Sequence, residues 1–167
     1  MKRYWSFIES PFQQFAAWVD EDGRLLRFHL HAANAAAVDS EAEHNPGRLA
    51  EVQRQVSEYA DGTRRDFGLE LAPTGPDFEM TVWKALRDIP FGTTASYGAV
   101  AKAIGQPNAA RAVGAANNAN PIALVIPCHR VIGADGQLVG YGGGLPLKRK
   151  LLEHEARVMG TRYDLFG

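Results

Sequence analysis

Alternating large and polar residues predict a β-sheet in the first part of the chain. Residues 4–9 alternate in this way, and we expect residues 15–19 to be a second strand. Residues 20–23, Asp-Glu-Asp-Gly, have the composition of a hairpin turn, and residues 25–30 then predict a third strand. Residues 32–46 show little pattern, so we expect a loop there.

A helix follows the loop. Apolar residues recur at helical spacing from Leu49 to Tyr59, and Asp61 followed by Gly62 supplies a stop signal. Residues 67–71 then predict a return to the sheet. The first half of the chain therefore indicates a small α/β or α+β unit.

A break in the chain follows, and the second half is predicted to be helical. The sequence Pro-Thr-Gly-Pro at residues 73–76 favours a domain boundary. We therefore expect one domain over residues 1–75 and a second over residues 76–167. The second opens with a helix whose apolar residues run along one face from Phe78 to Ile89, where a Pro-Phe-Gly run ends it.

Two short helices come next. Ser96 is placed to cap a helix over residues 97–104, and Gly105 suits its C-terminal left-handed position. Asn108 is placed to cap a second helix over residues 109–117. Two short helices joined by a tight, glycine-containing turn form the helix-turn-helix pattern. Alanine dominates the second helix, which suits close approach to a narrow minor groove or to another helix.

Composition and charge add two constraints. The 167-residue chain has one cysteine, which excludes an internal disulfide and a multi-cysteine zinc cluster. Residues 1–75 carry 8 Lys and Arg against 12 Asp and Glu, whereas residues 76–167 carry 10 against 7, and this basic excess permits polyanion binding. The sequence has no long apolar run and no secretory signal. We therefore expect no membrane partner and a cytoplasmic, reducing location.

The lone cysteine follows a short apolar run. Residues 122–126, Ile-Ala-Leu-Val-Ile, predict a buried strand that delivers Cys128 at its end. His129 and Arg130 come directly after it, and cationic neighbours favour the nucleophilic thiolate. A later amphipathic helix carries Glu155, a carboxylate that could orient His129 in a relay. The alternative is that Cys128 is only a small buried hydrophobe.

The cysteine segment resembles a known signature. Residues 127–133, Pro-Cys-His-Arg-Val-Ile-Gly, resemble the active site of the O6-alkylguanine-DNA alkyltransferases, also called methylated-DNA–protein-cysteine methyltransferases. The resemblance covers about residues 78–155. It is carried further by Val82-Trp83, Ile89-Pro90-Phe91-Gly92, Ser96-Tyr97, Ala109-Ala110-Arg111-Ala112-Val113-Gly114, Asn120-Pro121, Gly143-Gly144 and Leu151-Leu152-Glu153-His154-Glu155.

This resemblance implies a role for each catalytic residue. Cys128 would accept the alkyl group, His129 would take its proton through a bridging water, and Glu155 would orient His129. Asn120 would hold the turn before the active-site segment. Tyr97 would hydrogen-bond the flipped base and help the guanine to leave.

The resemblance also implies the surfaces that meet DNA and substrate. Arg111 would occupy the space of the extruded guanine, and its helix would lie in the minor groove. We expect further contacts to DNA on this helix from Ala109, Ala110, Ala112, Ala115 and Asn117. The substrate pocket would be lined by Val131, Tyr141, Gly142 and Gly143, where Gly142 replaces a serine found in some relatives.

Fold, partner and cofactor follow from the same resemblance. It implies an α+β fold, with a small ribonuclease-H-like α/β N-terminal domain and a mostly helical C-terminal domain that contains the helix-turn-helix. The partner would be double-stranded DNA carrying O6-alkylguanine, whose alkyl group passes once and irreversibly to Cys128 without an organic cofactor. We expect a monomer that could cluster on DNA. We expect no metal site, since His29, His31 and His44 have no partner cysteine.

Three other functions stay open on sequence alone. A relative that recognises alkylated bases without transfer would keep the DNA-binding surface, but such proteins replace the cysteine, often with tryptophan. A Cys-His-Glu hydrolase would be regenerated after each reaction, whereas an alkyltransferase is consumed. A purely structural module would tolerate Cys128→Ser without loss of function.

Overall fold

The chain folds into two units in the computed structural model, which describes residues 1–161. The first unit contains Met1–Thr74 together with Pro121–Val125. The second contains Gly75–Asn120 and the residues from Ile126 onward. A single cut after Gly75 is therefore too simple, because the residues just before the cysteine segment belong to the first unit.

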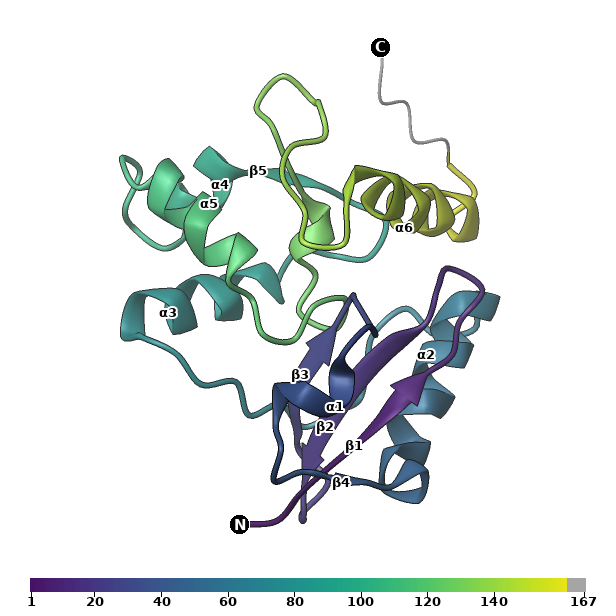
Figure 1. The fold of residues 1–167 in the computed structure, drawn as a ribbon. Coiled ribbons are helices and arrows are strands. Elements are labelled where there is room, and N and C mark those ends of the chain that lie inside the picture. Colours follow the sequence, from purple (N-terminus) through teal and green to yellow (C-terminus); the bar gives the residue numbers. More distant parts are fainter. Residues whose placement is uncertain (162–167) are drawn as a thin grey trace. The chain divides into compact units, whose positions relative to one another are not determined.

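A four-stranded sheet forms the centre of the first unit (Figure 1). Its strands are β1 (Arg3–Ile8), β2 (Phe15–Asp20), β3 (Leu25–His29) and β4 (Glu43–His44), in the order β3-β2-β1-β4. β2 pairs in antiparallel fashion with both β1 and β3, and β4 pairs in parallel with β1. The three strands expected from the first thirty residues are thus confirmed.

Residues 32–46 contain more structure than the expected loop. They include the short helix α1 (Ala35–Val38) and β4, and the 3₁₀ helix η1 (Pro46–Leu49) follows. Ala35 of α1 contacts a buried cluster that contains Trp5, Ala16 and Trp18. Short polar-flanked alanines gave no periodic signal, so the loop prediction was wrong here because tertiary packing decides this segment.

The remaining helix of the first unit is α2 (Ala50–Asp61), as expected. Its buried face includes Val52, Val56 and Tyr59, and it ends at Gly62, whose φ of 86° is left-handed. In Figure 1, α1 and α2 lie on opposite sides of the sheet. Both faces of the central strand β2 are therefore covered, and β2 is buried at every position.

Two predicted strands are wrong. Residues 67–71 contribute only a single bridge, between Leu71 and Leu25. Ile122 likewise makes one bridge, in which the Phe28 N–H donates to the Pro121 carbonyl at 2.9 Å and the Ala123 N–H to the Phe28 carbonyl at 3.1 Å. The chain then turns, with Leu124 at a φ of 69°. The apolar run 122–126 reflected burial rather than strand geometry.

Helices dominate the second unit, and the whole chain is a mixed α/β protein. Its elements are α3 (Asp77–Leu86), β5 (Ala95–Ser96), α4 (Tyr97–Ala103), α5 (Ala110–Asn118), the 3₁₀ helix η2 (Cys128–Arg130), β6 (Val131–Ile132) and α6 (Leu145–Val158). β5 and β6 pair in parallel, which fixes the start of α4 beside the residues that follow η2. Within residues 1–161, no helix has the length and apolar character needed to cross a membrane.

The ends of α4 and α5 follow local chemistry only in part. The Ser96 hydroxyl accepts from the Ala99 N–H at 3.0 Å, and Gly105 has a φ of 77°, as both residue types predict. Asn108 does not cap α5, because the N-cap position is Ala109 and its side chain makes no capping bond. The predicted cap was therefore displaced by one residue.

Candidate active site

Cys128 lies at the start of η2 and is only 5% exposed. Its own N–H donates to the Ile126 carbonyl at 2.7 Å. The same carbonyl accepts from Nδ2 of Asn120 at 2.9 Å. Asn120 follows α5, so its amide ties the end of that helix to the segment that carries the thiol.

His129 and Glu155 form a fully buried pair beside the thiol. Nε2 of His129 lies 2.7 Å from Oε2 of Glu155, and neither residue is exposed. Glu155 projects from the last turn of α6, whereas His129 is the second residue of η2. The relay expected from sequence is therefore geometrically present between these two side chains.

Glu155 also binds a buried arginine. It accepts from Nε of Arg130 at 2.8 Å, from Nη2 of Arg130 at 3.2 Å, and from the Gly92 N–H at 3.1 Å. Nη1 of Arg130 donates to the Ile89 carbonyl at 2.8 Å, and the guanidinium lies 5.6 Å from the centre of the Phe91 ring. The Ile-Pro-Phe-Gly segment thus serves as a cradle for the Arg130–Glu155 pair.

These contacts set the charges of the pair. Burial alone raises the pKa of Glu155, but His129 and Arg130 outweigh it and hold that pKa well below its usual range. Burial lowers the pKa of His129; Glu155 opposes this, and Arg130 and Lys148 add to the lowering. At physiological pH we therefore expect a neutral imidazole beside a carboxylate.

The carboxylate also selects the tautomer of His129. A carboxylate only accepts hydrogen bonds, so a neutral His129 carries its proton on Nε2 and a lone pair on Nδ1. Nδ1 is buried and has no hydrogen-bond partner among residues 1–161. An unpaired basic nitrogen on the residue next to a buried thiol is the arrangement that general-base activation requires.

A negative charge on Cys128 would raise the pKa values of two tyrosines and a lysine. Burial raises the pKa of Tyr97 and that of Tyr141, and a negative charge on Cys128 raises both further. Both side chains therefore stay protonated phenols and keep an O–H to donate. Tyr97 also contacts α5, because a Cβ at Gly114 would lie 3.8 Å from its ring.

Lys148 was not assigned a role from sequence, yet it is fully buried. Its Nζ donates to the carbonyls of Val131 at 2.5 Å, Val139 at 2.8 Å and Gly140 at 3.5 Å. Burial lowers its pKa to about 8, and the charge of Cys128 opposes this. One signal could have found it: Lys148 shares the apolar face of α6 with residues 151, 152 and 155.

Two of the four pocket residues expected from the resemblance, Val131 and Tyr141, lie next to this lysine. Val131 is buried and is held by Lys148 through its carbonyl. The Tyr141 hydroxyl is buried without a hydrogen-bond partner in the described part of the chain, and its ring lies 5.9 Å from Nζ of Lys148. Gly142 is exposed, with open space where a Cβ would stand, and Gly143 is half-buried.

The exposed face of α5 holds most of the expected DNA-contacting residues. Arg111, Ala112 and Ala115 are exposed, whereas Ala109 and Ala110 at the start of the helix are half-buried. Small side chains surround one long cation on this face. That surface can approach a narrow groove closely with a single probing side chain.

Asn117 does not belong to that face. It is only 2% exposed, and its Nδ2 donates to the Cys128 carbonyl at 3.4 Å. The buried side of α5 comprises Val113, Ala116 and Asn117, which recur at helical spacing. The expected groove contact of Asn117 is therefore wrong, because the helix register turns this side chain toward the cysteine.

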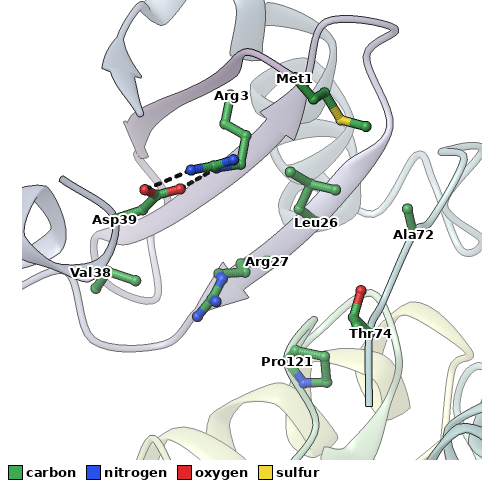
Figure 2. Close-up of a pocket in the computed structure, with 9 residues that line it drawn as sticks. All are labelled: Met1, Arg3, Leu26, Arg27, Val38, Asp39, Ala72, Thr74 and Pro121. Atoms are coloured by element: carbon green, nitrogen blue, oxygen red, sulfur yellow. Dashed lines mark hydrogen bonds and ion pairs between the residues drawn. The ribbon is translucent and has the colours of Figure 1, made fainter. Parts of the chain in front are cut away.

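A separate hollow lies within the first unit (Figure 2). It has a volume of about 670 Å³ and includes Arg3, Arg27, Asp39 and Pro121 in its lining. Arg3 is already paired, with Asp39 and with Glu41 at 3.1 Å. None of the residues that line this hollow is among the site residues expected from the sequence. Among residues 1–161, no three His, Cys, Asp or Glu side chains are grouped as a metal site requires.

Comparison with known proteins agrees with this geometry. Residues 77–157 match the family described as 6-O-methylguanine DNA methyltransferase, DNA binding domain. A methylated-DNA–protein-cysteine methyltransferase of Methanosarcina acetivorans is 44% identical over 91% of this chain and 97% of its own length. The chain belongs to this family. A relative of the same name from Mycobacterium leprae is 52% identical over 72% of this chain and 73% of its own length.

Solved structures of methylated-DNA–protein-cysteine methyltransferases extend the likeness to the fold. The Mycobacterium tuberculosis O6-methylguanine methyltransferase has a TM-score of 0.85 at 42% identity, covering 92% of each chain. A structure of the M. tuberculosis protein in complex with DNA has a TM-score of 0.86 at 41% identity, covering 93% of this chain and 94% of that one. Both units of this protein therefore have counterparts in the family.

Proposed function

We propose that this protein repairs O6-alkylguanine in duplex DNA by transferring the alkyl group to Cys128. The observation that carries the proposal is the buried thiol next to a His129 imidazole whose Nε2 is held by Glu155. Membership of the methylated-DNA–protein-cysteine methyltransferases supports the same reaction. Guanine O6 lies inside the stacked duplex, so the base must be flipped out before the thiol can reach it.

The reaction is a single displacement at the alkyl carbon. Through a bridging water, Nδ1 of His129 takes the thiol proton, and Sγ of Cys128 attacks the carbon. The S–C bond forms as the C–O6 bond breaks, and the electron pair of that bond leaves with guanine. The leaving base regains a proton, which the Tyr97 hydroxyl would supply, and protonated His129 would return a proton to Tyr97. The thioether is stable, so each molecule reacts once.

The α4–α5 pair would be the helix-turn-helix that binds DNA. Its exposed small residues on α5 support minor-groove docking, and Arg111 would fill the gap left by the flipped base. The solved structure of the M. tuberculosis protein in complex with DNA supports DNA as the partner. We infer binding with little sequence preference and strong salt dependence, because phosphate contacts would dominate the affinity.

The first unit would support the reactive one. Its mixed sheet, with β1, β2 and β3 antiparallel, is compatible with a ribonuclease-H-like domain. We infer that the protein acts as a monomer in the cytoplasm, since stoichiometric transfer needs one free thiol per molecule and a reducing environment keeps that thiol available.

Intact-protein mass spectrometry tests the transfer directly. The protein is incubated with duplex DNA containing O6-methylguanine, with Cys128→Ser as the matched control. We expect a gain of about one methylene, ~14 Da, on Cys128 and none in the control, with one event per molecule. Tight lesion binding without a mass gain would instead indicate a recognition protein, and repeated turnover on an ester would indicate a hydrolase.

The role of Arg111 has its own test. We expect Arg111→Ala to slow repair in duplex DNA by about tenfold or more while leaving the reaction with free O6-benzylguanine within about twofold, because a free base needs no extrusion. Exposed Arg87→Ala, at the C-terminal end of α3, is the control and should affect neither substrate. Equal losses on both substrates would exclude base extrusion as the role of Arg111.

A further inference from the structure

The helix proposed to meet DNA has little packing of its own. α5 has nine residues and buries only Val113, Ala116 and Asn117. Alanine side chains bury little apolar area, and a helix this short is unstable without contacts to the rest of the fold. Its N-cap position, Ala109, makes no side-chain capping bond. The position of α5 therefore depends on the few contacts that it does make.

One buried side chain is hydrogen-bonded directly to the backbone of this helix. Nε1 of Trp83, on α3, donates to the Ala116 carbonyl at 2.8 Å, and Trp83 is only 3% exposed. The last four carbonyls of a helix lack intrahelical partners, and Ala116 is among them. The Ala119 N–H, at 3.2 Å, is shared between this carbonyl and that of Ala115. The Trp83 indole therefore caps the C-terminal end of α5.

The indole ring is also held by the backbone at the start of the second unit. A Cβ at Gly75 would lie 2.5 Å from Cη2 and 2.8 Å from Cζ3 of Trp83. The Gly75 backbone thus lies directly against the ring, where a side chain would not fit. Packing therefore fixes the indole N–H in the position from which it donates to α5.

The capped end of α5 leads to the cysteine segment. Asn120, two residues after the helix, donates to the Ile126 carbonyl at 2.9 Å. Arg111, which we propose fills the gap left by the flipped base, lies on the same helix five residues before Ala116. When Arg111 enters the base stack, α5 has to resist displacement, and its small side chains offer little resistance. The bond from Trp83 supplies a fixed point at the C-terminal end.

Resting on the function proposed above, we propose that Trp83 is a positioning residue that fixes α5 through the Ala116 carbonyl while Arg111 extrudes the damaged base. Trp83 acts through α5 rather than on the substrate, so its effect depends on whether extrusion is needed. A free base needs no extrusion, whereas a base in the duplex does. Loss of the bond therefore slows repair of duplex DNA more than the reaction with a free base. A residue needed only for folding would slow both reactions alike.

The test removes the N–H and keeps an aromatic ring. Trp83→Phe lacks the donor, and Trp18→Phe is the matched control, because Nε1 of Trp18 is buried without a hydrogen-bond partner among residues 1–161. Intact mass follows single-turnover repair of O6-methylguanine in duplex DNA and labelling by free O6-benzylguanine, at a temperature where the variants are folded. We expect Trp83→Phe to slow duplex repair about tenfold and labelling less than about threefold. Trp18→Phe should keep the native ratio of the two rates.

Hydrogen exchange measures the helix itself, without DNA. In Trp83→Phe, the backbone amides of residues 116–120 should exchange about tenfold faster than in the native protein, because the end of α5 opens more often. Trp18→Phe should leave the exchange of these amides unchanged. Native exchange at these amides in Trp83→Phe would overturn the capping role.

Gly75→Ala reaches the same hydrogen bond from the linker. The new Cβ displaces the indole ring, so duplex repair should again fall more than labelling. In the Trp83→Phe background, Gly75→Ala should add little, because the shorter phenyl ring lacks the two colliding carbons. Gly68→Ala is the control, since a Cβ there makes ordinary contacts of 3.7 Å and 3.8 Å.

The outcomes separate this role from the transfer reaction. Equal slowing of both substrates in Trp83→Phe, or an unchanged ratio of the two rates, would overturn the positioning role of Trp83 while leaving the proposed function intact. A native protein that is not labelled at Cys128 by either substrate would instead contradict the proposed function.

Discussion

Two buried carboxylates, Asp20 in the first unit and Glu155 in the second, are paired in different ways. Asp20 accepts from the N–H groups of Asp22 and Arg24 and from Nε of Arg24, all within four residues along the chain. Glu155 accepts from His129, Arg130 and Gly92, which are 25 to 63 residues away. The first set closes a hairpin, whereas the second exists only in the folded unit.

The solvent exposure of the cations differs as well. The side chain of Arg24 is 36% exposed, whereas that of Arg130 is 7% exposed. A cation that keeps its water loses little on pairing, but a buried one depends on its carboxylate. Glu155 therefore holds a buried arginine and the catalytic base in one network. The comparison teaches that local pairing stabilises a turn, while distant pairing fixes the protonation of the site.

The largest effect should come from removing the distant carboxylate. Glu155→Gln leaves Arg130 buried without its counter-ion, and we expect the free energy of unfolding to fall by about 3–5 kcal/mol. Transfer from free O6-benzylguanine should fall by about a hundredfold or more, because His129 loses the group that fixes its tautomer. Chemical denaturation and single-turnover labelling at low temperature, where the variant is still folded, measure the two effects.

Glu153 on the same helix is the matched control. It is partly exposed and pairs with Arg149 at 3.0 Å in an i,i+4 arrangement. We expect Glu153→Gln to cost less than about 0.5 kcal/mol and to leave labelling unchanged. Similar losses in both variants would mean that the buried network has no special part in the chemistry.

Buried Lys148 should make the stability of the second unit depend on pH. In the unfolded chain it titrates near 10.5 and in the folded protein near pH 8, so between these values the unfolded state binds more protons. Stability should therefore rise with pH across this window, relative to Lys148→Met. The two pKa values differ by roughly 2.5, which at about 1.4 kcal/mol per unit gives at most about 3 kcal/mol.

Denaturant titrations at pH 7.5, 9 and 10.5 check this slope, with exposed Lys150→Met as the control. The native protein and the Lys150 variant should gain stability in parallel, and Lys148→Met should lack the gain. Labelling by O6-benzylguanine should also weaken as Lys148 loses its charge, since it then holds the Val131 and Val139 carbonyls less strongly. A slope that survives in Lys148→Met would assign it to another group.

Sequence alone predicted the features that depend on neighbours along the chain. Alternation located β1, the turn at residues 20–23 separated β2 from β3, and helical spacing located α2 and α6. Capping chemistry placed Ser96 and Gly105 correctly because both act on adjacent residues. The pairing of His129 with Glu155 was expected from the combination of motifs, and the structure brings the two together.

Features that depend on distant contacts could not be predicted in this way. The apolar run before the cysteine was taken as a strand, although only Ile122 pairs and Leu124 is left-handed. Arg130 was expected only as a cationic neighbour of the thiol and Lys148 was given no role, because nothing local shows that backbone carbonyls and Glu155 enclose them. Asn117 was expected to contact DNA because α5 as a whole was expected to do so. Packing, however, decides which residues of α5 are buried, and Asn117 is one of them.

Gly92 extends the comparison to the backbone that supports Glu155. Gly92 and Gly105 have nearly the same left-handed φ, 79° and 77°. A Cβ at Gly92 would collide with Met159, while Gly105 faces open space. We expect Gly105→Ala to cost about 1 kcal/mol for strain alone, and Gly92→Ala to cost about 2 kcal/mol.

Thermal or chemical denaturation distinguishes the two glycine variants, and Met159→Ala in the Gly92→Ala background should recover the difference. Labelling should slow only in Gly92→Ala, because its N–H donates to Glu155. Equal costs at both glycines would show that the collision is relieved freely and that the N–H is not critical.

Asp20→Asn should give the smallest effect and tests the other side of the comparison. Burial raises the pKa of Asp20, but the bonds from Arg24 and Asp22 outweigh it and the net pKa is lowered. The carboxylate therefore stabilises the fold above pH ~4, and this contribution is lost as the pH falls through the folded pKa. We expect Asp20→Asn to cost about 1 kcal/mol at pH 7 and almost nothing near pH 2. Labelling of Cys128 at pH 7 should be unchanged, since the turn closes on itself; a slower reaction would show that local pairing in the first unit also governs the site.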